Sequence, residues 1–442
     1  MTAVGLDVGT SGVKGLALGE DGTVLARAEA EYGLSTPRPG WAEQDPEDWW
    51  RASERVLAEL AEAAGPPAGI GLSGQMHGLV ALDDGDRVLR PAILWNDQRT
   101  AAEAAQIEAT IGVERLIELT GNRALTGFTA PKLEWLREHE PDVHARIAHV
   151  LLPKDYVRLR LTGERAIDVA DASGTLWLDV GARAWSREVL EALGVDEAWL
   201  PRLLESPEVS GTTRDERATP VAAGAGDQAA GALGVGVVAP GGPLSVVLGT
   251  SGVVFAAQKD FSPDPQGRVH AFCHAVPGAW HTMGVMLSAA GSLRWLRDIA
   301  ARGEDFGALV EEASAWDPGA EGLTFLPYLA GERTPHADPD ARGSFTGLAL
   351  RHDRGALVRA VLEGVAFGLR DALDLVGGDA AVGRLSGGGG RSELWRRIVA
   401  SVLELPLERV AVEEGAAYGA ALLGGIAGGM WADHAEAVAA CA

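Results

Sequence analysis

The sequence predicts an α/β protein with two domains of similar plan that enclose a central cleft. The pentapeptide GTSGV occurs at residues 9–13 and again, letter for letter, at residues 249–253, each time after an apolar run. Both halves then alternate predicted strands with predicted helices, which is typical of α/β domains. A chain of 442 residues is also too long for one ordinary hydrophobic core. We therefore interpret the chain as a duplicated unit whose two glycine-rich turns face one ligand.

The composition is that of a globular protein, with 47% hydrophobic and 23% charged residues. The formal net charge of −24 argues against nucleic acid or an anionic membrane as a partner, so a phosphate site has to be built from local backbone amides. The sequence shows no signal peptide and no run of about 18 uncharged apolar residues. Cys273 and Cys441 lack the spacing of a disulfide framework or a metal site. These features predict a cytoplasmic protein.

The first half is predicted to open with a three-stranded meander over residues 3–30. Asp45 and Pro46 are typical of a helix start, and Gly65 ends the predicted helix at about residue 64. Further strands are expected at 68–72, 79–82 and 91–95, and further helices at 99–111 and 129–138. Residues 140–215 are predicted to be mostly helical and to form an insertion on the first domain.

The second half repeats this logic. An apolar run to Ala223 leads into a glycine turn at 224–228 and a helix to about residue 233. A second hairpin at 244–255 and two aromatic-rich strands before Ser288 follow. Helices are expected at 287–301, 353–376 and 391–403, and the last helix is expected to begin near residues 413–415.

A polar segment at 212–217 predicts the domain boundary, with domains at 1–218 and 219–442. Two such domains with facing hairpins describe the duplicated ATPase fold of actin, hexokinase and Hsp70 (ribonuclease H-like), in which a nucleotide lies in the cleft. No Walker A sequence is present, which argues against a P-loop enzyme. The glycine run at 387–390 lacks the acidic partner of a dinucleotide fingerprint.

Asp7 and Asp227 are the candidate residues for phosphate chemistry. Asp7 ends an apolar strand, where an uncompensated carboxylate would be costly, so we predict that it serves a divalent cation or its water shell. The alternative is a carboxylate that caps the turn's own amides. Asp227 precedes a helix whose dipole keeps a carboxylate ionised, which suits a proton acceptor in phosphoryl transfer, although a plain N-cap is the common alternative. Lys14 could reach a phosphate or be solvated.

A polar cluster at the ends of two predicted strands suggests a polyol site. It consists of Gln75, Met76 and His77 together with Trp95, Asn96, Asp97 and Arg99. Sites gather at strand ends, although a lone histidine is more often structural. The glycines at 387–390, with Gly291, would allow close approach of a flat ring.

These motifs together resemble the FGGY family of carbohydrate kinases over nearly the whole chain. Residues 5–14 and 248–252 resemble its phosphate motifs, 127–136 a family signature, 331–335 and 342–348 a later block, and 386–392 the adenosine motif. Residues 75–78 with 95–99 point, within the family, to members that phosphorylate D-xylulose. Ala356 departs from a usually polar position, which we interpret as a surface change.

The resemblance implies ATP-dependent phosphorylation of D-xylulose to D-xylulose 5-phosphate, with ATP and Mg²⁺ as cofactors and a ketose as the partner. Asp227 would be the base and Asp7 the residue that positions Mg²⁺ through water. The ketose would be held by Gln75, Met76, His77, Trp95, Asn96 and Asp227. ATP would be held by Thr10, Ser11, Lys14, Gly249, Thr250, Gly291, Gly387, Gly388, Gly389 and Ser392. Another kinase of the family (for L-ribulose, gluconate, a deoxy-ketose or glycerol) and a non-catalytic sugar- or nucleotide-binding relative remain alternatives, and a homodimer is left open.

Overall fold

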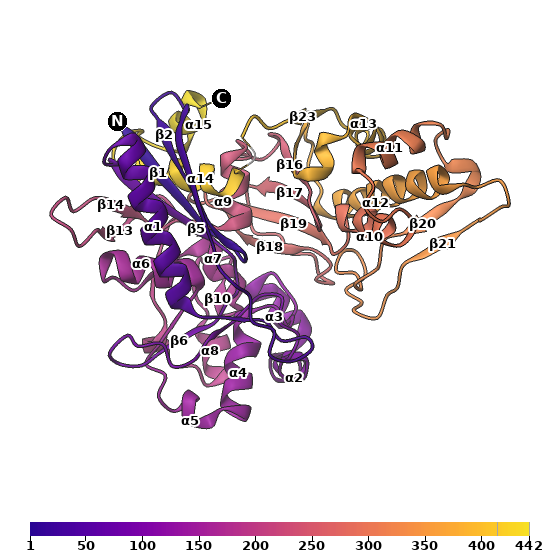
Figure 1. The fold of residues 1–442 in the computed structure, drawn as a ribbon. Coiled ribbons are helices and arrows are strands. Elements are labelled where there is room, and N and C mark those ends of the chain that lie inside the picture. The colour runs from indigo at the N-terminus through magenta and orange to yellow at the C-terminus, as the bar shows by residue number, and fades with distance from the viewer. Residues whose placement is uncertain (413, 442) are drawn as a thin grey trace.

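The computed structural model describes residues 1–412 and 414–441, and its first domain is built on one mixed sheet (Figure 1). The strands of this sheet are β1 (Thr2–Val8), β2 (Gly12–Gly19), β3 (Val24–Glu31), β5 (Gly69–Gly74), β13 (Val209–Thr212), β14 (Pro220–Ala222) and β15 (Ala225–Gly226). Their order is β13-β14-β5-β1-β2-β3, and β15 also pairs with β5. The predicted opening meander is therefore confirmed, because β1, β2 and β3 are consecutive antiparallel neighbours.

Helix α1 (Pro46–Ala64) covers one face of the first sheet and has the predicted bounds. Its N-cap is Asp45, whose side chain accepts a hydrogen bond from the Glu47 amide, and Pro46 occupies the first helical position. One side of the helix packs into the core of the first domain through Trp49, Val56 and Leu60. The local signals and the apolar periodicity therefore agree, which explains why this helix is predictable.

The second domain repeats the plan of the first. Its sheet contains β16 (Leu244–Leu248), β17 (Gly252–Gln258), β18 (His270–Cys273), β19 (Trp280–Met286), β22 (Gly383–Ser386) and β23 (Leu407–Arg409). The order is β18-β19-β17-β16-β22-β23. The hairpin β16–β17 has the parallel neighbour β22, just as the hairpin β1–β2 has the parallel neighbour β5. The duplicated fold predicted from the repeated pentapeptide is therefore confirmed.

The first sheet extends beyond residue 218, the predicted domain boundary. Strands β14 and β15 lie after this residue and both pair with β5. The polar segment taken as a connection is the turn between β13 and β14, and a hairpin turn is as solvated as a linker. The chain leaves the first domain through α9 (Asp227–Gly234), and we propose that the division falls between this helix and β16.

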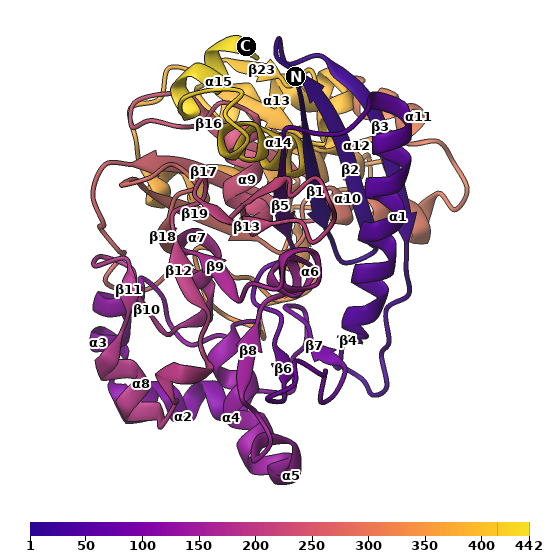
Figure 2. The ribbon, with the colours of Figure 1, turned by 90° about the vertical axis from the view of Figure 1, so that its left-hand side faces the viewer.

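A separate lobe lies at the end of the molecule away from both termini (Figure 2). Its helices are α2 (Ala101–Ile111), α3 (Val113–Thr120), α4 (Thr129–His139), α5 (Pro141–His144) and α8 (Arg187–Leu193). Helices α6 (Pro153–Thr162) and α7 (Val169–Ala172) lie between this lobe and the first sheet.

The segment at 140–215, expected to be mostly helical, alternates short helices with strands. These strands are β8 (His149–Leu151), β9 (Ala166–Asp168), β10 (Leu178–Asp179), β11 (Ala184–Trp185) and β12 (Arg202–Leu204). Strand β8 pairs with β6 (Val80–Leu82), and β12 pairs with β9. Such short runs carry too little periodicity to distinguish strand from helix.

The C-terminal part of the chain returns to the first domain. Helices α10 (Ala290–Ala300), α11 (Phe306–Ser314), α12 (Arg354–Val376) and α13 (Glu393–Leu403) belong to the second domain, as do the paired strands β20 (Thr324–Leu326) and β21 (Ser344–Thr346). Helix α14 (Gly415–Ala427) instead packs on β1 and β5, beside which Figure 1 shows it in yellow.

A further helix, α15 (His434–Ala440), follows α14, so the helix expected to be the last is not the last. The predicted last helix is expected to begin near residues 413–415, and Glu413 lies outside the described residues. Of the helices formed by residues 1–412 and 414–441, none has the length and apolar character needed to cross a membrane.

Candidate functional site

A cavity of about 250 Å³ lies between the two domains and gathers residues that are far apart in the sequence. From the first half it is lined by Met76, His77, Trp95, Leu125, Gly127 and Phe128, and from the second by Asp227, Gln228, Ser251, Val253, Met283, Val285 and Arg333. The predicted sugar cluster and the predicted base therefore line the same cavity, and the base lies close to the cluster because β15, which precedes Asp227, pairs with β5, which precedes Gln75 and Met76.

Asp7 lies near the end of β1, opposite Lys14 of β2 and Ser73 of β5. Burial raises the pKa of Asp7 to about 6, against the lowering effects of the Lys14 charge and the Ser73 hydroxyl. One of its carboxylate oxygens, Oδ1, is buried and has no hydrogen-bond partner. A buried carboxylate oxygen without a partner, next to a turn of small residues, fits a ligand of a divalent cation.

Asp227 is the first residue of α9 and follows the short strand β15. Burial raises the pKa of Asp227 to about 7, the negative charge of Asp7 adds to this, and hydrogen bonds from Gln228 oppose it. The helix start is expected to keep this carboxylate ionised, but burial opposes that effect, so its pKa lies above the usual value. A pKa near 7 nevertheless suits a general base better, because a base works best when its pKa lies near the operating pH.

His77 is held so that one ring nitrogen remains an acceptor. Its Nδ1 lies 2.8 Å from the Gly174 carbonyl oxygen, so Nδ1 carries the proton and Nε2 has a free lone pair. Burial lowers the pKa of His77 to about 3, with further lowering by the Lys132 charge, so the ring is neutral at physiological pH. A neutral imidazole in this state accepts a hydrogen bond from a hydroxyl group.

The backbone of His77 depends on Lys132, a residue for which the sequence suggested no role of its own. His77 has a positive φ of 68°, which is uncommon outside glycine. Its carbonyl oxygen accepts hydrogen bonds from Lys132 Nζ at 3.0 Å and from Thr129 Oγ1 at 3.1 Å. Lys132 also donates to the carbonyls of Gly127 and Phe128 and is fully buried. The signature segment at 127–136 thus supports the sugar loop.

Gln75 is buried and does not line the cavity. It is 2% exposed, donates to the Gly9 carbonyl oxygen and to Gln44 Oε1, and accepts a hydrogen bond from Thr10 Oγ1 at 3.1 Å. Trp95, which does line the cavity, donates from Nε1 to the same Thr10 hydroxyl at 3.0 Å. Both side chains therefore tie the sugar loops to the first hairpin tip, although the sequence suggested that Gln75 would face the ligand.

Two other predicted residues, Asn96 and Lys14, do not line the cavity. Asn96 is partly buried, and its Oδ1 has no hydrogen-bond partner. Lys14 is exposed and lies across the hairpin from Asp7. The neighbouring Asp97 and Arg99 form a buried ion pair with each other, so we assign them a structural role.

The second hairpin tip is joined to the start of α10. The Gly249 carbonyl oxygen accepts a hydrogen bond from the Ala290 amide, and the Thr250 carbonyl oxygen accepts hydrogen bonds from the amides of Ala289 and Gly291. A Cβ atom at Gly291 would lie 2.9 Å from the Thr250 oxygen, so only glycine allows this approach. The side chains of Thr250 and Ser251 remain exposed at the tip.

The predicted adenosine motif lies against the base of the same hairpin. Gly387 has a φ of 90°, and a Cβ there would lie 2.7 Å from the Leu248 backbone. A Cβ at Gly389 would meet the Leu248 side chain, whereas Gly388 borders open space. The Ser392 hydroxyl caps α13 by accepting a hydrogen bond from the Trp395 amide. The glycine run, the hairpin tip and the start of α10 therefore form one continuous backbone surface.

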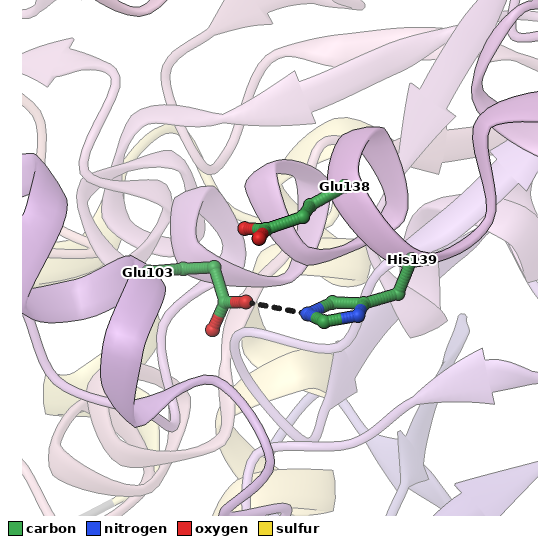
Figure 3. A group of neighbouring side chains, drawn as sticks. All are labelled: Glu103, Glu138 and His139. Carbon is green, nitrogen blue, oxygen red and sulfur yellow. Dashed lines mark hydrogen bonds and ion pairs between the residues drawn. The ribbon is translucent and has the colours of Figure 1, made fainter.

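Within the described part of the chain, one group of side chains has the spacing of metal ligands, and it lies far from Asp7 in the sequence. Glu103 on α2 and Glu138 and His139 on α4 have ligand atoms within 4.8 Å of one another (Figure 3). His139 Nε2 and Glu103 Oε1 are hydrogen-bonded at 3.1 Å. This hydrogen bond links α2 to α4 in the outer lobe, which is a structural reason for these side chains to lie close together.

Comparisons with known proteins agree with this arrangement. Two descriptions match the chain: "FGGY family of carbohydrate kinases, N-terminal domain" over residues 2–234 and the corresponding C-terminal domain over residues 244–428. A xylulose kinase from Escherichia coli (strain K12) is 46% identical and aligns with 96% of this chain and 90% of its own length.

Two solved structures are similar over almost the whole chain. A crystal structure described as a xyloylose kinase from Brucella ovis is 47% identical, with a TM-score of 0.92 over 97% of this chain and 91% of that one. A gluconate kinase from Lactobacillus acidophilus is 26% identical, with a TM-score of 0.93 over 99% of this chain and 91% of that one. With both domains matched and the two walls of one cavity assembled from them, the chain belongs to the FGGY family of carbohydrate kinases.

Proposed function

We propose that this carbohydrate kinase transfers the γ-phosphoryl group of ATP to the terminal hydroxyl of D-xylulose, which gives D-xylulose 5-phosphate and ADP. The observation that carries the proposal is the shared cavity that Asp227, Met76 and His77 line together. The identity of 46% to a protein named xylulose kinase supports this choice of sugar.

Asp227 is the proposed general base. Its carboxylate accepts the proton of the terminal hydroxyl as that oxygen forms a bond to the γ-phosphorus, while the bond from this phosphorus to the bridging oxygen of ADP breaks. A pKa of about 7 supports this role, because the group is substantially deprotonated at neutral pH yet remains basic enough to take a proton.

Asp7 is the proposed residue for holding Mg²⁺, directly or through water. Its buried Oδ1 without a partner supports this assignment. When bound, Mg²⁺ neutralises charge on the phosphate oxygens. Without the metal, the negative charge of Asp7 adds to the raised pKa of Asp227, and bound Mg²⁺ would offset that charge.

The remaining residues are proposed to bind and orient the two substrates. His77 Nε2 accepts a hydrogen bond from a sugar hydroxyl, and Met76 and Trp95 provide apolar surface for the carbon chain. The two hairpin tips hold the phosphates through backbone amides and the hydroxyls of Ser11 and Thr250, whereas the Thr10 hydroxyl donates to Gln75 and fixes the shape of the first tip. The glycine run at 387–389 borders the nucleoside. Closure of the domains excludes water and limits hydrolysis of ATP.

The decisive variant is Asp227→Ala. We expect turnover to fall by about 10² to 10⁴, the usual contribution of a positioned base, while calorimetric titration still detects binding of sugar and nucleotide. Asp305→Ala is the matched control, because Asp305 caps α11 by accepting hydrogen bonds from backbone amides and has no place in the cavity. Turnover of Asp227→Ala within tenfold of the wild type would remove Asp227 from the base role.

The substrate is tested on the wild-type enzyme with a coupled assay of ADP release. D-xylulose is compared with L-ribulose, gluconate, a deoxy-ketose and glycerol. We expect the highest kcat/KM with D-xylulose. A clear preference for gluconate would fit the likeness to the gluconate kinase and would replace our choice of sugar. Absence of turnover with every sugar, despite binding, would favour a non-catalytic relative.

A further inference from the structure

Arg333 is a cation in the sugar cavity that feels the charge of the neighbouring Glu332 but whose guanidinium forms no ion pair among the described residues. It lies in the segment between β20 and β21, and its side chain lines the same cavity as His77 and Asp227. Among residues 1–412 and 414–441, no carboxylate forms an ion pair with its guanidinium. The one hydrogen bond of this side chain to the described protein is a long one, from Nη1 to His270 Nε2 at 3.5 Å. A guanidinium has five N–H donors, so most of its donor capacity is available to a ligand.

A chain of hydrogen bonds with a fixed direction ends at Arg333. The Asn122 amide group donates to the carbonyls of Thr120 and Ala271, so Asn122 Oδ1 is the acceptor. His270 Nδ1 lies 2.6 Å from this oxygen and must therefore carry the proton. Burial lowers the pKa of His270 well below its usual value, so its Nε2 is a bare acceptor that faces Arg333.

This chain crosses from one domain to the other. Asn122 follows α3 in the outer lobe, whereas His270 lies on β18 of the second sheet. The His270 ring is stacked on Phe272, with centroids 5.6 Å apart, and meets the edge of Phe128, which lines the cavity. The hydrogen bond between Asn122 and His270 thus joins the two domains, whereas the contact of His270 with Arg333 lies within the second domain.

The backbone on both sides of Arg333 is also anchored. Glu332 is 2% exposed, and its Oε1 accepts hydrogen bonds from the amides of Leu287 and Arg333 at 3.0 and 2.7 Å. The Thr334 hydroxyl donates to the Arg268 carbonyl oxygen at 2.8 Å, and the Thr334 amide donates to the Val285 carbonyl oxygen. A cationic side chain held at its backbone and at its tip, with donors to spare in a sugar cavity, is typical of a ligand-binding arginine.

We propose that Arg333 binds the ketose by donating hydrogen bonds to oxygens other than the reacting hydroxyl, and that Asn122 and His270 hold it in position. Asp227 accepts the proton of the reacting hydroxyl and His77 Nε2 accepts a second hydrogen bond, so both need hydroxyl donors from the sugar. The carbonyl oxygen of an open-chain ketose can only accept, and Arg333 supplies the donors that these residues lack. This inference rests on the proposed function, because it concerns how the same cavity selects its sugar.

The test compares Arg333→Met and Arg333→Lys with the wild type. For Arg333→Met we expect KM for the ketose to rise about tenfold to hundredfold, the usual effect of losing hydrogen bonds from a charged donor, while KM for ATP stays unchanged. Titration calorimetry of the ketose without nucleotide should show the same loss. Arg333→Lys keeps the charge but loses the planar set of donors. Its KM for the ketose should therefore lie between those of the wild type and Arg333→Met. Arg342→Met, which removes an exposed arginine from the same segment, is the control.

The positioning role is tested with His270→Phe, which keeps the ring packing and removes both nitrogens. Alone it should raise KM for the ketose severalfold, and in the Arg333→Met background it should add nothing, because it acts through the arginine. If His270→Phe does not fold, Asn122→Ser tests the same chain. A full additional effect in the double variant would overturn the positioning role.

The result that would overturn the binding role is a KM for the ketose within twofold of the wild type in a folded Arg333→Met variant. The ratio of variant to wild type is measured on whichever sugar the wild type prefers. The test of Arg333 therefore stays valid if D-xylulose is the wrong sugar, and the two failures can be told apart.

Discussion

At the scale of single residues, the sugar loop depends on buried polar groups that hydrogen-bond one another in series. Lys132 makes hydrogen bonds to three carbonyl oxygens, and one of these belongs to His77. His77 in turn donates to Gly174, which leaves its other nitrogen for the sugar. A buried polar group without a hydrogen-bond partner lowers the stability of the fold. Loss of one group in this series therefore leaves its neighbour without a partner.

Removal of the Lys132 amine should therefore affect both stability and sugar binding. In Lys132→Met the carbonyls of His77 and Gly127 lose a donor, and we expect the free energy of unfolding in urea to fall by about 1 to 3 kcal/mol. KM for the ketose should rise, because the strained His77 backbone loses its support, while KM for ATP should not. Lys259→Met, at an exposed position, is the control. Unchanged KM for the ketose would mean that Thr129 alone holds the loop.

At the scale of elements, strands β18 and β19 bring a cluster of neutral histidines into the joint between the domains. His270, His274 and His281 are each at most 5% exposed, and they pack against Phe255 and Phe272. Burial lowers the pKa of His274 to about 3 and lowers the pKa values of His270 and His281 well below 6.5. His281 stacks on Phe255 with centroids 4.2 Å apart, and neither of its nitrogens has a hydrogen-bond partner.

These histidines should make the protein less stable in acid. Below pH 6.5 the unfolded chain binds protons at these positions while the folded chain does not, so the free energy of unfolding decreases as pH falls through this range. Each histidine contributes at most about 1.4 kcal/mol per pH unit. Urea unfolding at pH 7.5 and 5.5 should show a smaller decrease for His281→Leu than for the wild type.

This prediction concerns the difference in pH dependence between the wild type and His281→Leu, and not the pH dependence of the wild type alone. The pKa values of Asp171, Asp227 and Glu332 are raised to about 8, 7 and 7, and such carboxyl groups change stability with pH in the opposite sense. They are present in both proteins and cancel in the difference. An equal pH dependence for wild type and His281→Leu would contradict a neutral, buried His281.

At the scale of the whole molecule, the end of the chain closes onto its beginning. Helix α14 packs on the first sheet with its backbone almost in contact with the strands. A Cβ at Gly424 would lie 2.4 Å from the Gly71 amide nitrogen, and a Cβ at Gly71 would lie 1.7 Å from the Ala420 carbonyl oxygen. Small residues on both sides therefore let the last part of the chain complete the first domain.

Gly424→Ala tests this packing, because the usual effect of the substitution has the opposite sign. In an exposed helix, alanine in place of glycine stabilises by about 0.5 to 1 kcal/mol. Here the added methyl group meets backbone atoms of β5, so we expect destabilisation by about 1 to 3 kcal/mol in urea unfolding. Gly33→Ala, at a position with no atom near the added carbon, is the control. A gain in stability for Gly424→Ala would contradict the close packing.

Much of this molecule could be predicted because its signals are local. The cap at Asp45, the apolar face of α1 and the repeated GTSGV turns each lie within a few residues and report directly on helix, hairpin and duplication. Short strands such as β9 and the true extent of the first sheet could not be predicted, because a three-residue run becomes a strand only when a distant partner is present. The polar segment at 212–217 is predicted to connect two domains, but it is the turn between β13 and β14, whose pairing the sequence does not show.

The same distinction holds for the site. The sequence by itself determined the family resemblance, the two hairpins and the candidates Asp7, Asp227, Met76 and His77, since these residues lie in recognisable motifs. Only the tertiary structure decided that Gln75 supports the hairpin instead of lining the cavity, that Lys132 holds the sugar loop, and that Arg333 faces the cavity with a fixed donor direction. The physical reason is that a buried polar group is defined by its hydrogen-bond partners, and here those partners come from other parts of the chain.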